Sequence, residues 1–155
     1  MADTDDRFAP ISGKEGPTPL FLDTSGLFPY FDPDTEEHDE VNEFLRGRIV
    51  ELGYRPLYTN RYVVDELVTL LLYKTGRETA VKAYDAVMES ETVRLLDVSD
   101  EVFERAGESL REHEGSDASF TDHTVAVQAK DENVSHVLAY DGDFERLGMN
   151  VVPRG

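Results

Sequence analysis

The chain lacks several features that would each have pointed to a class of protein. None of its 155 residues is a cysteine, which excludes a disulfide framework, a thiolate metal site and a cysteine nucleophile. It also lacks an uninterrupted apolar run of about 18 residues, so we expect no transmembrane span. The first 19 residues are polar and contain no apolar stretch like that of a secretory signal. We therefore expect a cytoplasmic protein that does not enter a membrane.

Basic residues are also scarce. The chain has 33 acidic residues against 15 basic ones, which gives a net charge of −18, and the acids are spread along the chain. An evenly acidic surface with little lysine is typical of halophilic proteins, because the Debye length falls to about 3 Å in 1 M salt and self-repulsion is screened. Such a charge would ordinarily argue against a nucleic-acid partner. In concentrated salt, however, long-range steering is lost, and local arginines together with a metal ion would have to bind the partner.

The apolar residues alternate between strand-like and helix-like patterns. Residues 1–18 read as a flexible, polar extension, and residues 19–155 read as one domain. Helices are predicted after the capping residues Asp34, Asn60, Ser99 and Ser119, with a further helix over 80–88 and one helical turn from Asp143 to Gly148. Strands are predicted at residues 19–22, 56–59, 93–96, 136–140 and 150–152. This alternation predicts an α/β fold with a mainly parallel sheet that is covered on both faces.

Two carboxylates follow predicted strands directly. Asp23 comes after the strand at 19–22, and Asp141 comes after the strand at 136–140. In a parallel α/β sheet, ligands bind beyond the carboxyl ends of the strands. Either acid alone could simply cap a turn, but two in one sheet favour a functional site.

The predicted helix after Asn60 carries two adjacent acids with different surroundings. Residues four apart share a helix face, which places Glu66 with Tyr62 and Leu70, against the apolar stripe of the helix. A carboxylate there is unfavourable to bury unless a cation or hydrogen-bond donors compensate it. Asp65 falls on the outer face, where an ordinary ion pair suffices. We therefore take Glu66 as the functional candidate and Asp65 as a solvated residue, although Glu66 could also reach water at the helix edge.

Two further acids lie in the second half of the chain. Asp122 is the last residue of a Ser-Phe-Thr-Asp sequence that resembles a capping box, and it shares a face with small alanines that leave room beside it. Asp143 could cap a short helix or serve as an additional ligand, whereas Asp117 reads as a turn residue. Several inward carboxylates without a counter-charge suit a hard divalent cation such as Mg²⁺ or Mn²⁺. Such an ion can activate a water and neutralise charge on a phosphate.

At this point a family resemblance becomes visible in four short motifs. They are FLDTSGL at 21–27, VDEL at 64–67, SFTD at 119–122 and YDGDF at 140–144. Their order and spacing resemble those of PIN domains, most closely the VapC toxins of toxin–antitoxin pairs, from about Pro19 to Pro153. The resemblance implies a three-layer α/β/α sandwich and metal-dependent cleavage of single-stranded RNA by a metal-activated water, leaving 5′-phosphate and 3′-hydroxyl ends. It also implies a homodimer and an inhibiting antitoxin partner.

The resemblance further implies which residues carry the activity. Asp23, Glu66, Asp122 and Asp141 match the family's acidic quartet, and Asp143 is a possible fifth metal ligand. Two features depart from the family pattern. Ala139 stands where members often have Thr or Ser, two residues before the fourth acid, and the 18-residue extension is longer than usual.

Other readings of the same residues remain open to different degrees. A housekeeping RNA-processing nuclease, or a PIN-like binding module without activity, would have the same acids. The Asp23-Thr24-Ser25-Gly26 sequence resembles the Asp-Thr-Gly of aspartic proteases, but it has an inserted residue and occurs once, in an α/β pattern. A phosphohydrolase with a nucleophilic Asp would usually have a second Asp at position 25, which is Ser. No histidine lies in a nucleophile-elbow context.

Overall fold

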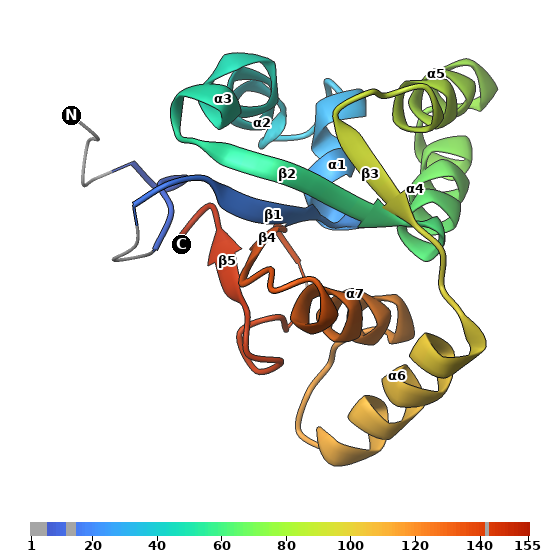
Figure 1. Cartoon of the computed structure of the whole chain (residues 1–155). Helices are drawn as coiled ribbons and strands as arrows, with labels where there is room; N and C mark the ends of the chain where they lie inside the picture. Colours follow the sequence, from blue (N-terminus) through green and yellow to red (C-terminus); the bar gives the residue numbers. More distant parts are fainter. Residues whose placement is uncertain (1–5, 12–14, 142) are drawn as a thin grey trace.

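A five-stranded parallel sheet forms the centre of the protein (Figure 1). The computed structural model describes residues 6–11, 15–141 and 143–155. The strands lie in the order β3-β2-β1-β4-β5. Their bounds are Thr18–Leu22 for β1, Tyr54–Asn60 for β2, Val93–Leu96 for β3, His136–Leu138 for β4 and Asn150–Val152 for β5.

Helices cover the sheet and form the outer layers of an α/β/α sandwich. Figure 1 shows α2 and α3 above the sheet and α6 and α7 below it. Helix α1 contacts both α2 and α4, α4 packs on α5, and α6 packs on α7. The helices are α1 (Thr24–Phe31), α2 (His38–Glu43), the π-helix η1 (Phe44–Arg48), α3 (Ile49–Glu51), α4 (Arg61–Lys74), α5 (Arg77–Met88), α6 (Asp100–Glu112) and α7 (Phe120–Asp131). The predicted fold class is confirmed.

Three of the predicted helix caps are present. The side chains of Asn60, Ser99 and Ser119 each accept a hydrogen bond from a backbone N–H in the first turn of α4, α6 and α7. Each satisfies one of the four N–H groups that a helix start leaves without an internal partner. These caps fix where the helices that carry the predicted site residues begin.

The sequence reading was wrong about three local elements. No helix was predicted between Asp23 and Asp34, but Asp23 caps α1, which contains Gly26 and Pro29. The helix predicted from Asp34 to Gly53 starts only at His38 and is interrupted by the π-helix η1. The predicted helical turn at Asp143 is a series of turns instead. Breaker residues and a π-bulge leave little trace in apolar spacing, because that spacing is set by the face a segment buries.

The N-terminal segment (residues 6–11) packs against the domain, where a flexible extension was expected. The ring of Phe8 is buried and stacks on Phe44 with 4.5 Å between ring centroids. The backbone N–H of Ile11 donates to His136 Nε2 at 2.9 Å. A polar stretch with one well-placed aromatic residue thus becomes ordered. Of the predicted extension 1–18, residues 1–5 and 12–14 lie outside the described residues, and β1 begins at Thr18.

The strand order places the ends of β1 and β4 side by side. The chain moves outward from β1 through β2 to β3, then returns to the other side of β1 for β4 and β5. Leu22 at the end of β1 pairs with Leu138 at the end of β4. This reversal is the switch point at which ligands bind in open α/β sheets. Within the described residues, no helix is both long and apolar enough to cross a membrane.

Candidate active site

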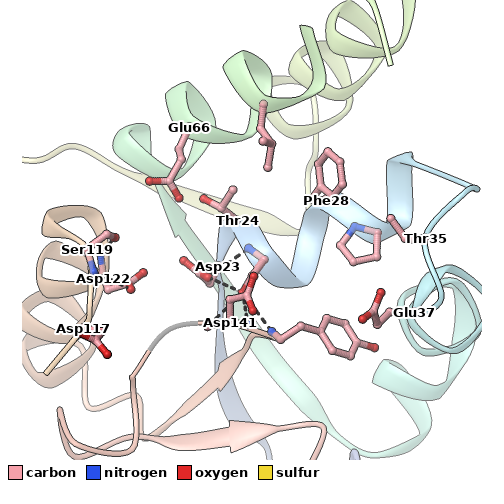
Figure 2. A pocket seen from close by; sticks show the side chains of 14 residues that line it. Asp23, Thr24, Phe28, Thr35, Glu37, Glu66, Asp117, Ser119, Asp122 and Asp141 are labelled. Atoms are coloured by element: carbon pink, nitrogen blue, oxygen red, sulfur yellow. Dashed lines mark hydrogen bonds between the residues drawn. The ribbon is translucent and has the colours of Figure 1, made fainter. Parts of the chain in front are cut away.

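A pocket of about 490 Å³ opens at the carboxyl ends of β1 and β4. Figure 2 shows Asp23, Glu66, Asp122 and Asp141 directed toward a common space from different elements. Their backbone positions are the end of β1, the helices α4 and α7, and the loop after β4. The pocket therefore gathers the four acids that the sequence singled out.

Asp23 is the most deeply buried of these acids, with 3% of its surface exposed. Its Oδ2 accepts hydrogen bonds from the backbone N–H of Ser25 at 3.1 Å and from the Ser25 hydroxyl at 2.8 Å. Its Oδ1 is buried and has no hydrogen-bond partner in the part of the chain that the structure describes. Burial, and then the negative charge of Asp122, raise the pKa of the Asp23 carboxyl to about 7. This carboxylate thus has an oxygen available for a cation.

The two adjacent acids of α4 point in different directions. Glu66 is half-buried and lines the pocket, whereas Asp65 is exposed and does not. This is the distinction that helix periodicity predicted. Arg61, one turn earlier, pairs with Asp97. The outer face of α4 is therefore solvated, and Glu66 is the acid that α4 contributes to the pocket.

Asp122 closes the predicted capping box at the start of α7. The backbone N–H of Ser119 donates to Asp122 Oδ2 at 3.0 Å, and the backbone N–H of Asp122 donates to Ser119 Oγ at 3.1 Å. Burial raises the pKa of the Asp122 carboxyl, and the negative charges of Glu66 and Asp141 raise it further. The hydrogen bond from Ser119 fixes the Oδ2 atom of Asp122. The negative charges that act on this carboxyl belong to Glu66 and Asp141, which also line the pocket.

A buried polar network fixes α4 relative to α7. Asn60 caps α4 through Oδ1, and its Nδ2 donates to Thr124 Oγ1 at 3.1 Å and to Gln128 Oε1 at 2.8 Å. All three side chains are buried. Because Glu66 lies on α4 and Asp122 on α7, this network sets their separation.

Ser25 joins the loop after β4 to the start of α1. Its hydroxyl donates to Asp23 Oδ2 and accepts from the backbone N–H groups of Tyr140 and Asp141, both at 3.0 Å. The hydroxyl that members of the family often carry at position 139 is absent here, where the residue is alanine. Ser25, in the first turn of α1, places a hydroxyl beside the backbone of the fourth acid instead.

The structure changes the roles expected for two acids. Asp143 does not line the pocket, and its Oδ2 accepts from the backbone N–H of Asp117 and lies 3.4 Å from Arg146 Nε. Asp117, taken as a plain turn residue, lines the pocket instead. The loop before α7 bends so that Asp117 faces the pocket, and no periodic pattern could have indicated this.

The donor set fits a hydrated divalent cation. Within residues 6–11, 15–141 and 143–155, no three carboxylate or imidazole groups converge closely enough to coordinate an ion on their own. Mg²⁺ usually keeps several waters and is held through one or two carboxylates. The unpartnered Asp23 Oδ1 and the mutual repulsion of the acids are the features that such an ion would satisfy. Asp23, Glu66, Asp122 and Asp141 are the residues that would hold it.

Sequence reasoning did not find the residues that position the acids. Ser25 lies in a stretch that reads as a turn, and Asn60 was recognised only as a cap. Thr24, whose buried hydroxyl has no partner among the described residues, lies beside Asp23 and Glu66 in the pocket (Figure 2). An unusually polar sequence after an apolar strand, Asp23-Thr24-Ser25, was the available signal.

Comparison with known proteins agrees with this geometry. The PIN domain family model matches residues 20–149. The 23S rRNA-specific endonuclease VapC20 of Mycobacterium tuberculosis is 33% identical over 91 residues, which are 59% of this chain and 69% of VapC20. The crystal structure of VapC20, described as a sarcin-ricin loop cleaving toxin, superposes with a TM-score of 0.76 and 27% identity, covering 84% of this chain and 96% of that one.

A more distant structure shares the fold. VapBC2 of Rickettsia felis, solved bound to a promoter DNA fragment, has a TM-score of 0.60 at 15% identity and covers 86% of this chain and 97% of its own. With a family model that spans most of the chain and a sheet in which its acidic motifs meet, the protein belongs to the PIN-domain family.

Proposed function

We propose that the protein is a Mg²⁺- or Mn²⁺-dependent endoribonuclease and the toxin of a toxin–antitoxin pair. The observation that carries the proposal is the pocket at the switch point, which four carboxylates line and in which buried Asp23 keeps an oxygen without a partner among the described residues. The match to the PIN family and the endonuclease activity in VapC20's name support it.

In this proposal the acids have distinct tasks. The divalent ion, when bound, supplies a water of lowered pKa and a positive charge against the phosphate. Asp23 and Asp122 hold the inner side of the site, because they are the most buried acids and are fixed by Ser25 and Ser119. Glu66 and Asp141 are more accessible and face the incoming phosphodiester. Ser25 keeps Asp23 and the backbone of Asp141 in register, so that the acids need not rearrange during reaction.

RNA is the proposed substrate, and an antitoxin is the proposed regulator. VapC20 is named for cleavage of 23S rRNA, which makes ribosomal RNA loops the first substrates to test here. The similarity to VapBC structures supports an antitoxin partner, and the family resemblance supports a homodimer. A housekeeping RNA-processing nuclease is the alternative, and growth arrest upon expression that is relieved by a neighbouring reading frame would favour the toxin.

The decisive experiment is an RNA-cleavage assay in high KCl with Mg²⁺ or Mn²⁺. The wild type and Asp65→Asn should both cut RNA, and a chelator should abolish the cleavage. Loss of residues that merely support a metal ligand lowers affinity or activity about 10- to 100-fold, so Asp23→Asn should lose about 100-fold or more. Equal cleavage by wild type and Asp23→Asn would trace the activity to a contaminant and refute the proposal.

A further inference from the structure

The pocket has two chemically different ends. Asp23, Asp122 and Asp117 lie at one end, whereas Phe28, Thr35 and Glu37 lie at the other (Figure 2). Pro29 and Tyr140 also line the pocket. The acids explain a metal-assisted reaction at one end of the pocket, but that reaction does not explain why aromatic side chains line the pocket as well. We define the aromatic end by Phe28 and Tyr140.

The two rings of the aromatic end line the pocket and also pack against the hydrophobic core. Both side chains are only half-buried. Among the described residues, neither ring pairs with another aromatic ring, although eight other aromatic pairs occur. An aromatic side chain exposed in a pocket gains free energy from a planar partner.

The Tyr140 ring is held in place from behind. Its hydroxyl donates to Glu40 Oε1 at 2.7 Å, and Glu40 Oε2 accepts from Arg7 Nη1 of the N-terminal segment at 2.8 Å. A side chain fixed in this way loses little conformational entropy when a ligand stacks on it.

The charges at this end select the kind of group that could bind. No lysine or arginine among the described residues lines the pocket, whereas Glu37 does, so a phosphate at the aromatic end would be repelled by that carboxylate. A carboxylate accepts hydrogen bonds from the N–H groups on the edge of a nucleobase. The aromatic end therefore suits a neutral, planar group with N–H donors, attached to a phosphate that lies at the acidic end.

We propose that Phe28 and Tyr140 form a subsite in which the base of a nucleotide next to the scissile phosphate stacks. This inference rests on the proposed nuclease function and adds a binding determinant to it. Protein recognition of single-stranded RNA commonly uses stacking of splayed bases on aromatic side chains. Continuity with the acidic end within one pocket favours RNA over an antitoxin side chain as the occupant.

The test compares intact RNA with RNA that lacks one base. The cleavage site of the wild type is first mapped, and short RNAs are then made with an abasic nucleotide on either side of that site. Single-turnover rates are measured against enzyme concentration for wild type, Phe28→Ala, Tyr140→Ala and Tyr140→Phe. Tyr73→Ala is the control, because Tyr73 is 88% exposed on α4 and does not line the pocket.

On intact RNA, Phe28→Ala and Tyr140→Ala should each weaken half-saturation about 10-fold, the scale of base–aromatic stacking. Tyr140→Phe should weaken half-saturation less than Tyr140→Ala does, since it keeps the ring. Tyr73→Ala should show the same half-saturation as wild type. With the abasic nucleotide on the stacking side, wild type should itself weaken about 10-fold, and the alanine variants should lose nothing more. Urea unfolding of each variant accounts for any loss of fold.

Three outcomes would overturn the subsite. Phe28→Ala and Tyr140→Ala could show the same half-saturation as wild type on intact RNA. They could also weaken half-saturation by the same factor on intact and on abasic RNA. They could also keep RNA cleavage and lose only inhibition by the antitoxin, which would assign the rings to that partner. If the wild type cleaves no RNA at all, the proposed function fails first, and the subsite fails with it.

Discussion

At the scale of single residues, the site depends on a carboxylate that the fold holds in an unfavourable state. Asp23 is buried with one unpartnered oxygen, and Asp122 nearby adds negative charge. Its pKa of about 7 in the folded protein exceeds the ordinary value of 3.8. Because the pKa is higher in the folded protein, folding favours the neutral form of Asp23. The contribution of this group to the unfolding free energy is therefore fully present below about pH 3.8 and is lost as the pH rises through about 7.

The first prediction concerns that pH dependence. Asp23→Asn removes the buried charge and keeps an oxygen to accept from Ser25, so it should raise the unfolding free energy of the metal-free protein at pH 8. A pKa difference of about three units sets an upper bound of roughly 4 kcal/mol. Urea unfolding in high KCl with a chelator measures this, and the gain should shrink toward pH 4. A gain independent of pH, or one shared by exposed Asp65→Asn, would contradict the explanation.

The second prediction separates the two acids of α4. Glu66→Gln should lower RNA cleavage at least about 10-fold without changing the unfolding free energy by more than about 0.5 kcal/mol, because Glu66 is only half-buried. Asp65→Asn should leave both unchanged. Cleavage rates and urea midpoints for the pair decide the matter, and the reverse pattern would mean that Asp65 is the ligand.

Sequence reasoning found the acids of the pocket but not their supports. Strand ends and helix faces are periodic features, so spacing made Asp23, Glu66, Asp122 and Asp141 candidates, and the family resemblance grouped them as one site. Asp143, which could have been either a cap or an additional ligand, does not line the pocket, whereas Asp117 does. Both lie in loops, where no periodic pattern predicts the direction of a side chain. Ser25 was not found because its partners, the N–H groups of Tyr140 and Asp141, are more than 100 residues away.

At the scale of elements, helix α1 lies very close to the end of β4. A Cβ added at Gly26 would stand 2.4 Å from the backbone oxygen of Leu138, a distance that backbone atoms cannot accommodate without shifting. Glycine at position 26 therefore allows α1 to lie close to the end of β4. This places Asp23, which caps α1, next to the loop that carries Asp141.

The third prediction follows from this contact. Gly26→Ala should destabilise the protein by about 1–3 kcal/mol, as overpacking does, and should also lower cleavage because the two acids separate. Gly107→Ala in α6 is the matched control, since nothing lies within 4 Å of its added Cβ. It should stabilise by up to about 1 kcal/mol. If Gly26→Ala and Gly107→Ala changed the unfolding free energy in urea equally, α1 would be able to shift away from β4 at no cost in stability.

The fourth prediction concerns the N-terminal segment. Phe8→Ala should destabilise the protein by about 3 kcal/mol, because it removes a buried ring stacked on Phe44. Ile11→Ala should change little, since that side chain is 44% exposed. Chemical denaturation of both variants measures the unfolding free energy. If Phe8→Ala left it unchanged, the N-terminal segment would not contribute to stability.

The elements themselves were predictable where one face of each is buried. All five strands were found, two of them with both ends correct and the others with ends displaced by at most two residues, because parallel strands read as apolar runs. The interrupted helix around η1 was read as continuous, since the stripe of Val41, Phe44 and Ile49 is kept across the π-turn. Residues 6–11 were expected to be flexible because their order depends on contacts with Phe44, Tyr54 and His136, which lie much later in the chain.

At the scale of the whole molecule, a net charge of −18 on 155 residues implies strong self-repulsion. The fifth prediction is that the melting temperature rises between 0.1 M and 2 M KCl, most steeply at the lower concentrations where screening changes most. Differential scanning calorimetry measures it, and uncharged sucrose at matched osmolality is the control. A melting temperature that is flat or falling with KCl would remove the basis for a salt-adapted protein.

The switch-point arrangement also has a consequence for translation. Asp23 and Glu66 come before Asp122 and Asp141 in the order of synthesis, and β4 must pair with β1 before Asp141 can join the other acids. A ribosome that has not passed codon 141 therefore carries a nascent chain with an incomplete site. If the protein cuts RNA, this order of synthesis protects the messenger and the ribosome that are producing it until the last acid has been added.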